Sequence, residues 1–266
     1  MSQPRNPDSF GEPRDAGPAV LLTGANGRVG RVLARAMSAR FQLRLCDLPD
    51  RGLDGLRPYG EVRPFDLTRP SEAASACADM DVLVHLAGEP SPTADWNRLL
   101  ALNIGMSETL FRAASQSSCR QIIVASSVHV VGGHPGLRIA DNASPNPATL
   151  YGVSKASVEA LGQQLANTST LSVTMLRIGG FRPPVTWPDA PDLGDCFVAP
   201  EDLTRLVFTL LSKAKRGYET INATSDVPAP KMSSKRMREL GCPPKWTWDG
   251  TRAVRRVEGD SSVDGT

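Results

Sequence analysis

A tyrosine, a lysine and a serine are spaced in a way that suits proton transfer. Tyr151 and Lys155 stand four residues apart, so on a helix both side chains lie on one face. An ammonium group near the phenol favours the phenolate and is expected to lower its pKa from about 10 toward neutrality. With the upstream hydroxyl of Ser127, such a phenol could take a proton from a substrate alcohol. Taken alone, the Tyr-Lys spacing also fits an ordinary amphipathic helix.

A glycine-rich turn near the N-terminus is typical of a dinucleotide site. The apolar run 19–23 predicts a buried strand, and Gly24, Gly27 and Gly30 follow it before a helical pattern. This spacing lets backbone amides and the helix N-terminus approach a pyrophosphate closely. The next predicted strand ends at Asp47, whose carboxylate can bond both ribose hydroxyls and repel a 2′-phosphate. The sequence therefore favours NAD over NADP.

NADP stays open as an alternative at this stage. Arg28, Arg44 and Arg51 lie close enough in sequence to offer a 2′-phosphate a partner. Asp66, after the third predicted strand, is placed either to reach the adenine edge or to cap the next helix.

Strands and helices alternate along the chain. The predicted strands after the first lie at 42–47, 61–66, 81–87, 121–127, 171–179 and 218–224. The predicted helices include 95–117, a helix from Tyr151, 200–212 and 231–240. Such alternation specifies an α/β fold with a doubly wound parallel sheet, the Rossmann fold. The segments 132–149 and 179–195 are rich in proline or glycine and are expected to be loops beside the site.

Two polar residues within apolar patterns need internal partners. Asn103 lies in the long helical stretch, where a buried amide is costly unless it bonds something, so it is expected to brace the active-site strand. His85 alternates with apolar neighbours and is expected to be a satisfied interior histidine rather than a catalytic group.

Composition and patterning divide the chain into four expected segments. Residues 1–18 are polar and proline-containing, which predicts a disordered leader, and residues 257–266 predict a disordered tail. Between them we expect a dinucleotide-binding core at 19–178 and a small C-terminal substrate lobe at 179–256, interleaved with the core.

Charge and cysteine usage exclude several classes of function. The hydrophobic share of 40%, the charged share of 22% and a net charge of +2 suggest neither a membrane protein nor a nucleic-acid partner. No stretch is apolar for long enough to span a membrane, so we expect a cytoplasmic protein. Five scattered cysteines and three histidines argue against a disulfide framework and a metal site.

The motifs together resemble an extended short-chain dehydrogenase/reductase of the NAD-dependent epimerase/dehydratase family. The resemblance rests on TGANGRVG at 23–30, Asp47, Asp66-Leu67, HLAG at 85–88, Asn103, Ser126-Ser127 and YGVSK at 151–155. Within the family the chain is most similar to uronate dehydrogenases. That similarity rests on SSVH at 126–129, LYGVSK at 150–155, LRIG at 176–179, PEDLTR at 200–205 and LGCPPK at 240–245.

The resemblance implies roles for individual residues. Tyr151 would be the general base, Lys155 would lower its pKa and hold the nicotinamide ribose, and Ser127 would bond the reacting oxygen. The implied NAD site comprises Gly24, Asn26, Gly27, Arg28, Val29, Gly30, Asp47, Asp66, Leu67, Leu86, Ala87, Gly88, Asn103, Tyr151, Lys155 and Ile178. The implied substrate site comprises Ser127, Val128, His129, Tyr151, Gly180 and Arg182.

Three positions depart from the uronate dehydrogenase pattern. Val128 replaces the asparagine of a Ser-Asn-His motif, and Gly180 replaces the serine of Arg-Ile-Gly-Ser. Asp192 falls where those enzymes carry an arginine for the substrate carboxylate, a role that Arg182 could take over. Lost hydrogen-bonding partners alter selectivity strongly. The resemblance therefore implies oxidation of a hydroxyl of a small sugar, sugar acid or related molecule.

Two other functions are compatible with the sequence. One is a sugar or nucleotide-sugar epimerase or dehydratase with tightly bound NAD, and the other is a non-catalytic dinucleotide-binding regulatory protein. The short C-terminal segment favours a small free substrate over a nucleotide-sugar. The resemblance also implies a homodimer formed through the helices that hold Asn103 and Tyr151.

Overall fold

A parallel sheet forms the centre of the protein in the computed structural model, which describes residues 17–181, 195–213, 215–248 and 253–255. The strands of the sheet are β1 (Gly17–Thr23), β2 (Phe41–Asp47), β3 (Glu61–Pro64), β4 (Val82–His85), β5 (Gln121–Ser127), β6 (Ser172–Ile178) and β9 (Gly217–Ala223). Their order is β3-β2-β1-β4-β5-β6-β9, and all neighbours are parallel. This is the doubly wound order of dinucleotide-binding proteins. The predicted fold class is confirmed.

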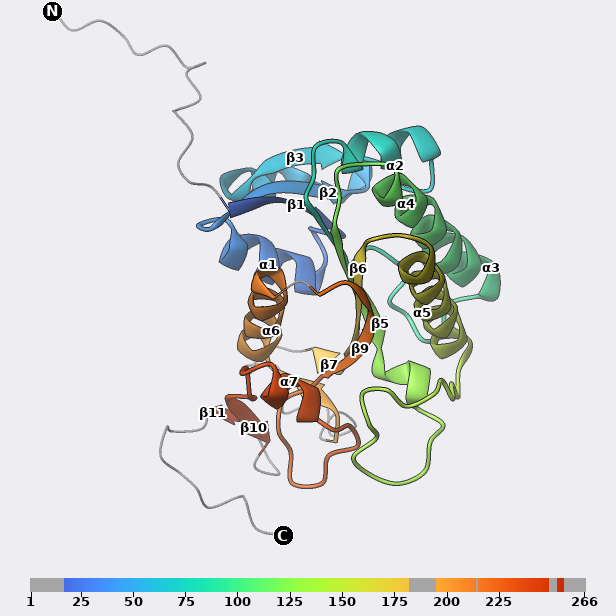
Figure 1. Ribbon diagram of the computed structural model, residues 1–266, viewed down its shortest axis with the longest axis vertical. Helices are drawn as coiled ribbons and strands as arrows, with labels where there is room; N and C mark the ends of the chain where they lie inside the picture. The colour runs from blue at the N-terminus through green and yellow to red at the C-terminus, as the bar shows by residue number, and fades with distance from the viewer. Residues whose placement is uncertain (1–16, 182–194, 214, 249–252, 256–266) are drawn as a thin grey trace, which may run out of the picture.

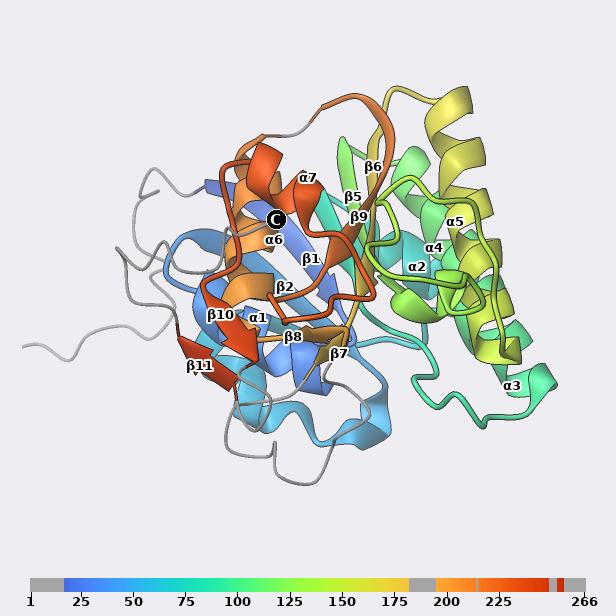
Figure 2. The ribbon, with the colours of Figure 1, turned by 90° about the horizontal axis from the view of Figure 1, so that it is seen from below.

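Helices cover both faces of the sheet, as Figures 1 and 2 show. They are α1 (Arg28–Met37), α2 (Pro70–Cys77), α3 (Trp96–Leu99), α4 (Met106–Ser115), α5 (Leu150–Thr168), α6 (Pro200–Ser212) and α7 (Lys235–Glu239). Shorter turns lie at Pro49–Arg51, Leu53–Tyr59 and Val128–Val131. In Figure 1, α1 and α6 lie on one side of the sheet, and α2, α4 and α5 lie on the other.

Each layer of helices buries its own apolar core against the sheet. On one face, Leu33 of α1 and Leu203 of α6 pack against β1 residues such as Val20. On the other face, Leu110 of α4 and Val158 of α5 pack into a second cluster. Because both faces are covered, the central strands read as nearly continuous apolar runs in the sequence, which is why they were predictable.

Short elements after β6 lie beyond the main sheet. β7 (Gly180–Phe181) pairs with β8 (Phe197–Val198), and β10 (Trp246–Trp248) pairs with β11 (Ala253–Arg255). Trp246 packs against a small cluster that includes Phe197. The division into a core and a substrate lobe stays a prediction, because α6 and β9 from the second segment complete the layers of the first.

Two predicted helices differ from the observed ones. The helix predicted at 231–240 begins only at Lys235, because the preceding residues are extended beside Ile139. The Ile139 amide donates to the Lys231 carbonyl (2.9 Å), and the Ser233 amide donates to the Ile139 carbonyl (2.9 Å). The helix predicted at 95–117 is α3 and α4 joined by a π-helical turn at Leu100–Gly105.

The predicted disordered ends lie almost entirely outside the described residues, although Gly17 and Pro18 already belong to β1. None of the helices in the described part of the chain is long and apolar enough to cross a lipid bilayer.

Candidate active site

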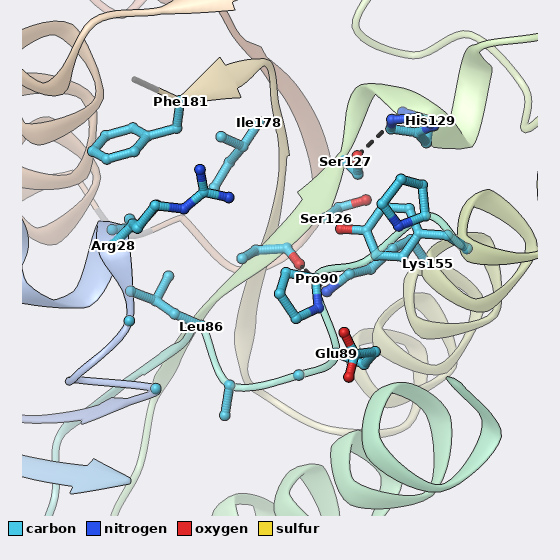
Figure 3. A pocket seen from close by; sticks show the side chains of 18 of the residues that line it. Arg28, Leu86, Glu89, Pro90, Ser126, Ser127, His129, Lys155, Ile178 and Phe181 are labelled. Carbon is cyan, nitrogen blue, oxygen red and sulfur yellow. Dashed lines mark hydrogen bonds between the residues drawn. The ribbon is translucent and has the colours of Figure 1, made fainter. Parts of the chain in front are cut away.

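The carboxyl ends of the parallel strands border a cavity of about 1210 Å³. With the exception of Asn103, every predicted cofactor or substrate residue that the structure describes lines this cavity. Arg182 and Asp192 lie outside the described residues. In Figure 3, Arg28, Leu86 and Ile178 lie on one side of the cavity, and Ser127 and Lys155 lie on the other. Ligands collect at this edge in open α/β sheets.

The backbone of the glycine-rich turn packs too closely for side chains at two of its glycines. Gly24 has a φ of +65°, and a Cβ there would lie 2.7 Å from the Ala87 amide nitrogen. A Cβ on Gly30 would lie 2.2 Å from the Gly24 carbonyl oxygen. Gly27 is the N-cap of α1 and has no side chain to cap the helix. The first backbone N–H groups of α1 can therefore donate hydrogen bonds to an anion. The residues present therefore fit a dinucleotide.

Asp47 stands at the end of β2 with its carboxylate fixed in the cavity wall. It accepts hydrogen bonds from the amides of Asn26 (2.9 Å) and Leu48 (2.9 Å). Each carboxylate oxygen has a second lone pair, so further bonds to ribose hydroxyls are available.

Arg44 is removed from the set of possible phosphate partners. Its guanidinium donates to the carbonyls of Ala76 (3.1 Å) and Ala78 (2.7 Å) at the end of α2 and pairs with Glu61 (2.8 Å). It does not line the cavity, whereas Arg28 and Arg51 do. Asp47 therefore faces the cavity without Arg44, the arginine three residues before it in the sequence. The absence of this cation favours NAD over NADP.

Tyr151, Lys155 and Ser127 meet at the other end of the cavity. Tyr151 and Lys155 lie one turn apart on α5, and the Lys155 ammonium nitrogen is 5.9 Å from the centre of the Tyr151 ring. The ammonium donates to the Ala125 carbonyl (2.9 Å), which leaves two N–H donors for other partners. Ser127, at the end of β5, hydrogen-bonds the Tyr151 phenol and accepts from the His129 amide (3.2 Å; Figure 3).

The expected lowering of the tyrosine pKa by lysine is wrong for this structure. Burial raises the pKa of Tyr151 above its usual value, the hydrogen bond with Ser127 lowers it in part, and the Glu89 carboxylate raises it further. Burial also lowers the pKa of Lys155 to about 8. The ammonium is directed at a backbone carbonyl rather than at the phenol oxygen, which explains why its charge has little effect on the phenol.

His129 packs against Tyr151. The two rings meet edge to face, with centres 5.4 Å apart and an angle of 84° between the planes. Partial burial lowers the pKa of His129, so the imidazole is neutral at physiological pH. A neutral imidazole beside the phenol can both donate and accept a hydrogen bond to substrate.

Asn103 braces the site from behind. Its carbonyl oxygen accepts from the Glu89 amide (2.8 Å), and its amide group donates to the Ser154 hydroxyl (2.9 Å). It thus ties the loop after β4 to α5, where the sequence had suggested a brace to the active-site strand, and it is not part of the cavity wall. His85 bonds Thr23 (2.8 Å) and Ser107 (3.0 Å), which confirms it as a satisfied interior residue.

The sequence reasoning missed five charged residues of the cavity wall, which are Arg31, Glu89, Arg98, Asp195 and Lys231. Glu89 pairs with Arg98, and Lys231 and Asp195 line the wall near β7 and β8. Burial would raise the pKa of Glu89, but hydrogen bonds from Arg98 and the Ser91 amide hold it below its usual value. Glu89 could have been found because it directly follows Gly88 at a strand end. Lys231 carries no such signal, since it reaches the cavity only through the fold.

In the described ranges, no group of three or more His, Cys, Asp or Glu residues is arranged to hold a metal ion.

The fold, the glycine turn and the Ser-Tyr-Lys set define an enzyme of the short-chain dehydrogenase type. The model of the NAD dependent epimerase/dehydratase family matches residues 20–181, and the chain belongs to this family. NAD is therefore its cofactor, in agreement with the fit of the glycine turn and Asp47.

Relatives by sequence include dehydrogenases that act on sugars. An NAD-dependent glucose-6-phosphate dehydrogenase from Haloferax volcanii is 34% identical over 176 residues, which are 60% of this chain and 67% of that protein. A uronate dehydrogenase from Agrobacterium fabrum is 28% identical over 239 residues, 89% of this chain and 87% of that protein. The first match spans only about two thirds of its relative.

Solved structures show the same likeness. The crystal structure of uronate dehydrogenase from Agrobacterium tumefaciens matches with a TM-score of 0.77 and 27% identity, covering 86% of this chain and 85% of that chain. A mutant of that enzyme complexed with NAD matches with a TM-score of 0.77 and 26% identity, covering 87% and 86% of the two chains.

Proposed function

We propose that this enzyme oxidises a hydroxyl group of a small sugar, sugar acid or related molecule, with Tyr151 as the general base. The observation that carries the proposal is the meeting of Ser127, Tyr151 and Lys155 in one cavity with the glycine turn and Asp47. The relatives, which include a glucose-6-phosphate dehydrogenase and a uronate dehydrogenase, support a sugar as the substrate class.

The roles of the three side chains follow from their positions. Bound NAD supplies the hydride acceptor. The Ser127 hydroxyl holds the reacting oxygen against the phenol, and Tyr151 takes the hydroxyl proton from the substrate. Lys155 keeps two N–H donors for the cofactor ribose while the Ala125 carbonyl fixes its position. Asp47 bonds the adenosine ribose at the far end.

The raised pKa of the phenol has a consequence for the pH dependence. The general base must be deprotonated before it accepts the substrate proton, and burial raises the pKa of Tyr151 above its usual value. Oxidation should therefore accelerate as the pH rises from neutral into the alkaline range, because the phenolate population increases. A rate that is independent of pH there would argue for a different base.

The substrate end of the cavity differs from a dedicated carboxylate site. Val128 contributes an apolar side chain that packs against Val130 and Ile139, and Gly180 contributes only backbone, which pairs with Phe197 in β7 and β8. Among the described residues, Lys231 contributes a cation to this wall, and its ammonium donates to the His134 carbonyl (2.7 Å). A hydroxyl-rich substrate is therefore as suitable as a uronate.

The test is a substrate panel with purified enzyme and NAD. The panel should contain uronates, neutral aldoses, aldonates and sugar phosphates, and NADH formation should be followed by absorbance. The proposal expects NADH from at least one class. Binding of NAD without NADH from any class contradicts it, and a product isomer without net NADH, detected by NMR, would support the epimerase alternative instead.

A further inference from the structure

The face of α5 that carries the tyrosine and lysine also carries a buried carboxylate. Tyr151, Lys155 and Glu159 follow one another at intervals of four residues, so their side chains project from the same side of the helix. Lys155 contacts β5 through the Ala125 carbonyl (2.9 Å), and Glu159 contacts β5 through the Ser126 hydroxyl, which donates to it (2.6 Å). Two successive residues of one strand therefore hold two successive turns of one helix.

Glu159 also holds the neighbouring strand. Arg177 of β6 donates to it through two guanidinium nitrogens, at 2.9 and 2.8 Å. The two side chains are almost fully buried, with 2% of Arg177 and 4% of Glu159 exposed. A bidentate pair of this kind fixes direction as well as distance.

The strand register places this pair directly beside the reacting groups. Ser126 stands opposite Arg177, and the next pair in register is Ser127 opposite Ile178. Both Ser127 and Ile178 line the cavity. A shift of the Glu159 carboxylate would therefore move the last residues of β5 and β6 relative to the phenol on α5.

Arg177 reaches one element more. It donates to the carbonyls of Asp141 (3.2 Å) and Ala143 (2.9 Å), in the loop that leads to α5. The guanidinium thus connects β6, α5 and the segment that enters α5. A contribution to the free energy of unfolding does not by itself explain why Glu159 and Arg177 are charged. A buried ion pair is often no more stabilising than apolar side chains of the same size.

We propose that Glu159 and Arg177 are positioning residues that set the distance between the Tyr151 phenol and the Ser127 hydroxyl, an inference that rests on the function proposed above. The pair touches neither the glycine turn nor Asp47, so it acts on the reacting end of the cavity alone. A misplacement of about 1 Å at such a site lowers turnover about 100-fold.

The test replaces the whole pair rather than one partner, because a single replacement would leave a buried charge unpaired. The variant Glu159→Leu/Arg177→Met removes both charges. The freed carbonyls of Asp141 and Ala143 border a second cavity of about 760 Å³, where water can bond them. The matched control is Glu219→Gln/Arg236→Met, which removes an ion pair (2.9 Å) at the rim of the same cavity.

The expected result is a split between binding and turnover. The pair variant should keep its thermal midpoint and its NAD affinity close to those of the wild type while kcat falls about 10- to 100-fold. The control should keep kcat. Full kcat in the pair variant overturns the proposal, as does a joint loss of NAD affinity and thermal midpoint, which would make the pair a purely structural element.

A smaller change keeps the test decisive if the double variant does not fold. Ser126→Ala removes only the hydroxyl that Glu159 holds, and it should lower kcat several-fold with little change in KM. An unchanged kcat in Ser126→Ala overturns the proposal.

A second readout does not depend on turnover. The chain has three tyrosines, so a ring-labelled sample gives few NMR signals, and Tyr151→Phe assigns one of them. The Tyr151 signal should move in the pair variant and stay in place in the control. If the wild type oxidises no substrate, the proposed function fails, but this shift still reports whether the pair positions the phenol.

Discussion

The two ends of the cavity are built on different principles. The nucleotide end consists of backbone turns at the ends of β1, β2 and β4, where Gly24 and Gly30 allow close approach and Asp47 adds one charge. The reacting end consists of side chains from segments far apart in the chain, including Ser127, Lys155 and Lys231. The first end specifies a cofactor through backbone shape, whereas the second specifies a substrate through the placement of individual side chains.

The two ends also differ in what they cost the fold. The glycine turn is closed by a backbone hydrogen bond, in which the Gly27 amide donates to the Gly24 carbonyl (3.0 Å). The reacting end instead buries an ammonium and the Glu159–Arg177 ion pair and partly buries a phenol, groups that lose hydration on folding. Changes at the first end should therefore alter NAD binding, whereas changes at the second should lower turnover without destabilising the fold.

The largest effect on NAD binding is expected at the glycine turn. In Gly30→Ala the new Cβ would lie 2.2 Å from the Gly24 carbonyl oxygen, so the turn and the start of α1 must separate. NAD affinity, measured by calorimetry, should fall about 100-fold, which corresponds to about 2.7 kcal/mol. Gly55→Ala is the matched control, since a Cβ there meets no atom within 4 Å. Equal NAD affinity in both variants would contradict the close fit of the turn.

Lys155→Met should stabilise the protein while it impairs oxidation. Burial lowers the pKa of Lys155 to about 8, so at pH 7 the folded state holds an ammonium at a cost. After the loss of the bond to Ala125 is subtracted, a gain of about 2 kcal/mol in unfolding free energy is expected at pH 7.

The pH dependence of this gain follows from the direction of the shift. Between pH 8 and the ordinary lysine pKa, the unfolded chain binds more protons than the folded one, so wild-type stability rises with pH. The advantage of Lys155→Met should therefore shrink over that range in denaturant titrations. Lys213→Met is the control, because its exposed ammonium also donates to a carbonyl, that of Leu240 (2.9 Å). A Lys155→Met protein that is less stable than the wild type at pH 7 would contradict the prediction that the buried Lys155 ammonium costs stability.

Asp47→Asn should lower NAD affinity at the nucleotide end by less than Gly30→Ala. The amide keeps the shape but removes the charge that accepts from ribose hydroxyls, so NAD affinity should fall about tenfold, or about 1.4 kcal/mol. Discrimination against NADP should narrow as well, because a 2′-phosphate no longer meets a carboxylate. Asp54→Asn serves as the control, because Asp54 is an exposed acid that pairs with Arg57. Preserved discrimination would show that another residue excludes the phosphate.

Glu89→Gln gives the smallest effect and concerns the reacting end. The Glu89 carboxylate raises the pKa of Tyr151, so its neutralisation should move the rise of the oxidation rate toward lower pH. Glu108→Gln, an exposed site on α4, should leave the pH profile unchanged. A shift toward higher pH in Glu89→Gln would contradict the assignment of the phenol as the titrating base.

The same contrast explains which features could be predicted from the sequence. Four features could be predicted from residues close together in the chain. They are the succession of strands and helices along the sequence, the glycine turn, Asp47 and the Tyr151–Lys155 spacing. The late start of α7 could not be predicted, because residues 231–233 pair with Ile139 nearly a hundred positions away. The raised pKa of Tyr151 depends on burial and on Glu89, which no local pattern contains.

Arg44 shows how a local pattern can also suggest a contact that the fold does not allow. Its place in the sequence suggested a phosphate partner, but its guanidinium binds the carbonyls at the end of α2. Neighbouring residues in β2 alternate between the two faces of the sheet, so Asp47 and Arg44 serve different layers. A cation near a nucleotide motif is therefore informative only once its own partners are known.

The most direct test of the account compares Tyr151→Phe with the wild type for NAD binding and NADH formation on the best substrate of the panel. The account predicts unchanged NAD affinity and a turnover lowered about 100- to 10,000-fold, because the phenylalanine keeps the ring beside His129 and removes only the proton acceptor. Turnover within a few-fold of the wild type would contradict the assignment of Tyr151 as the general base.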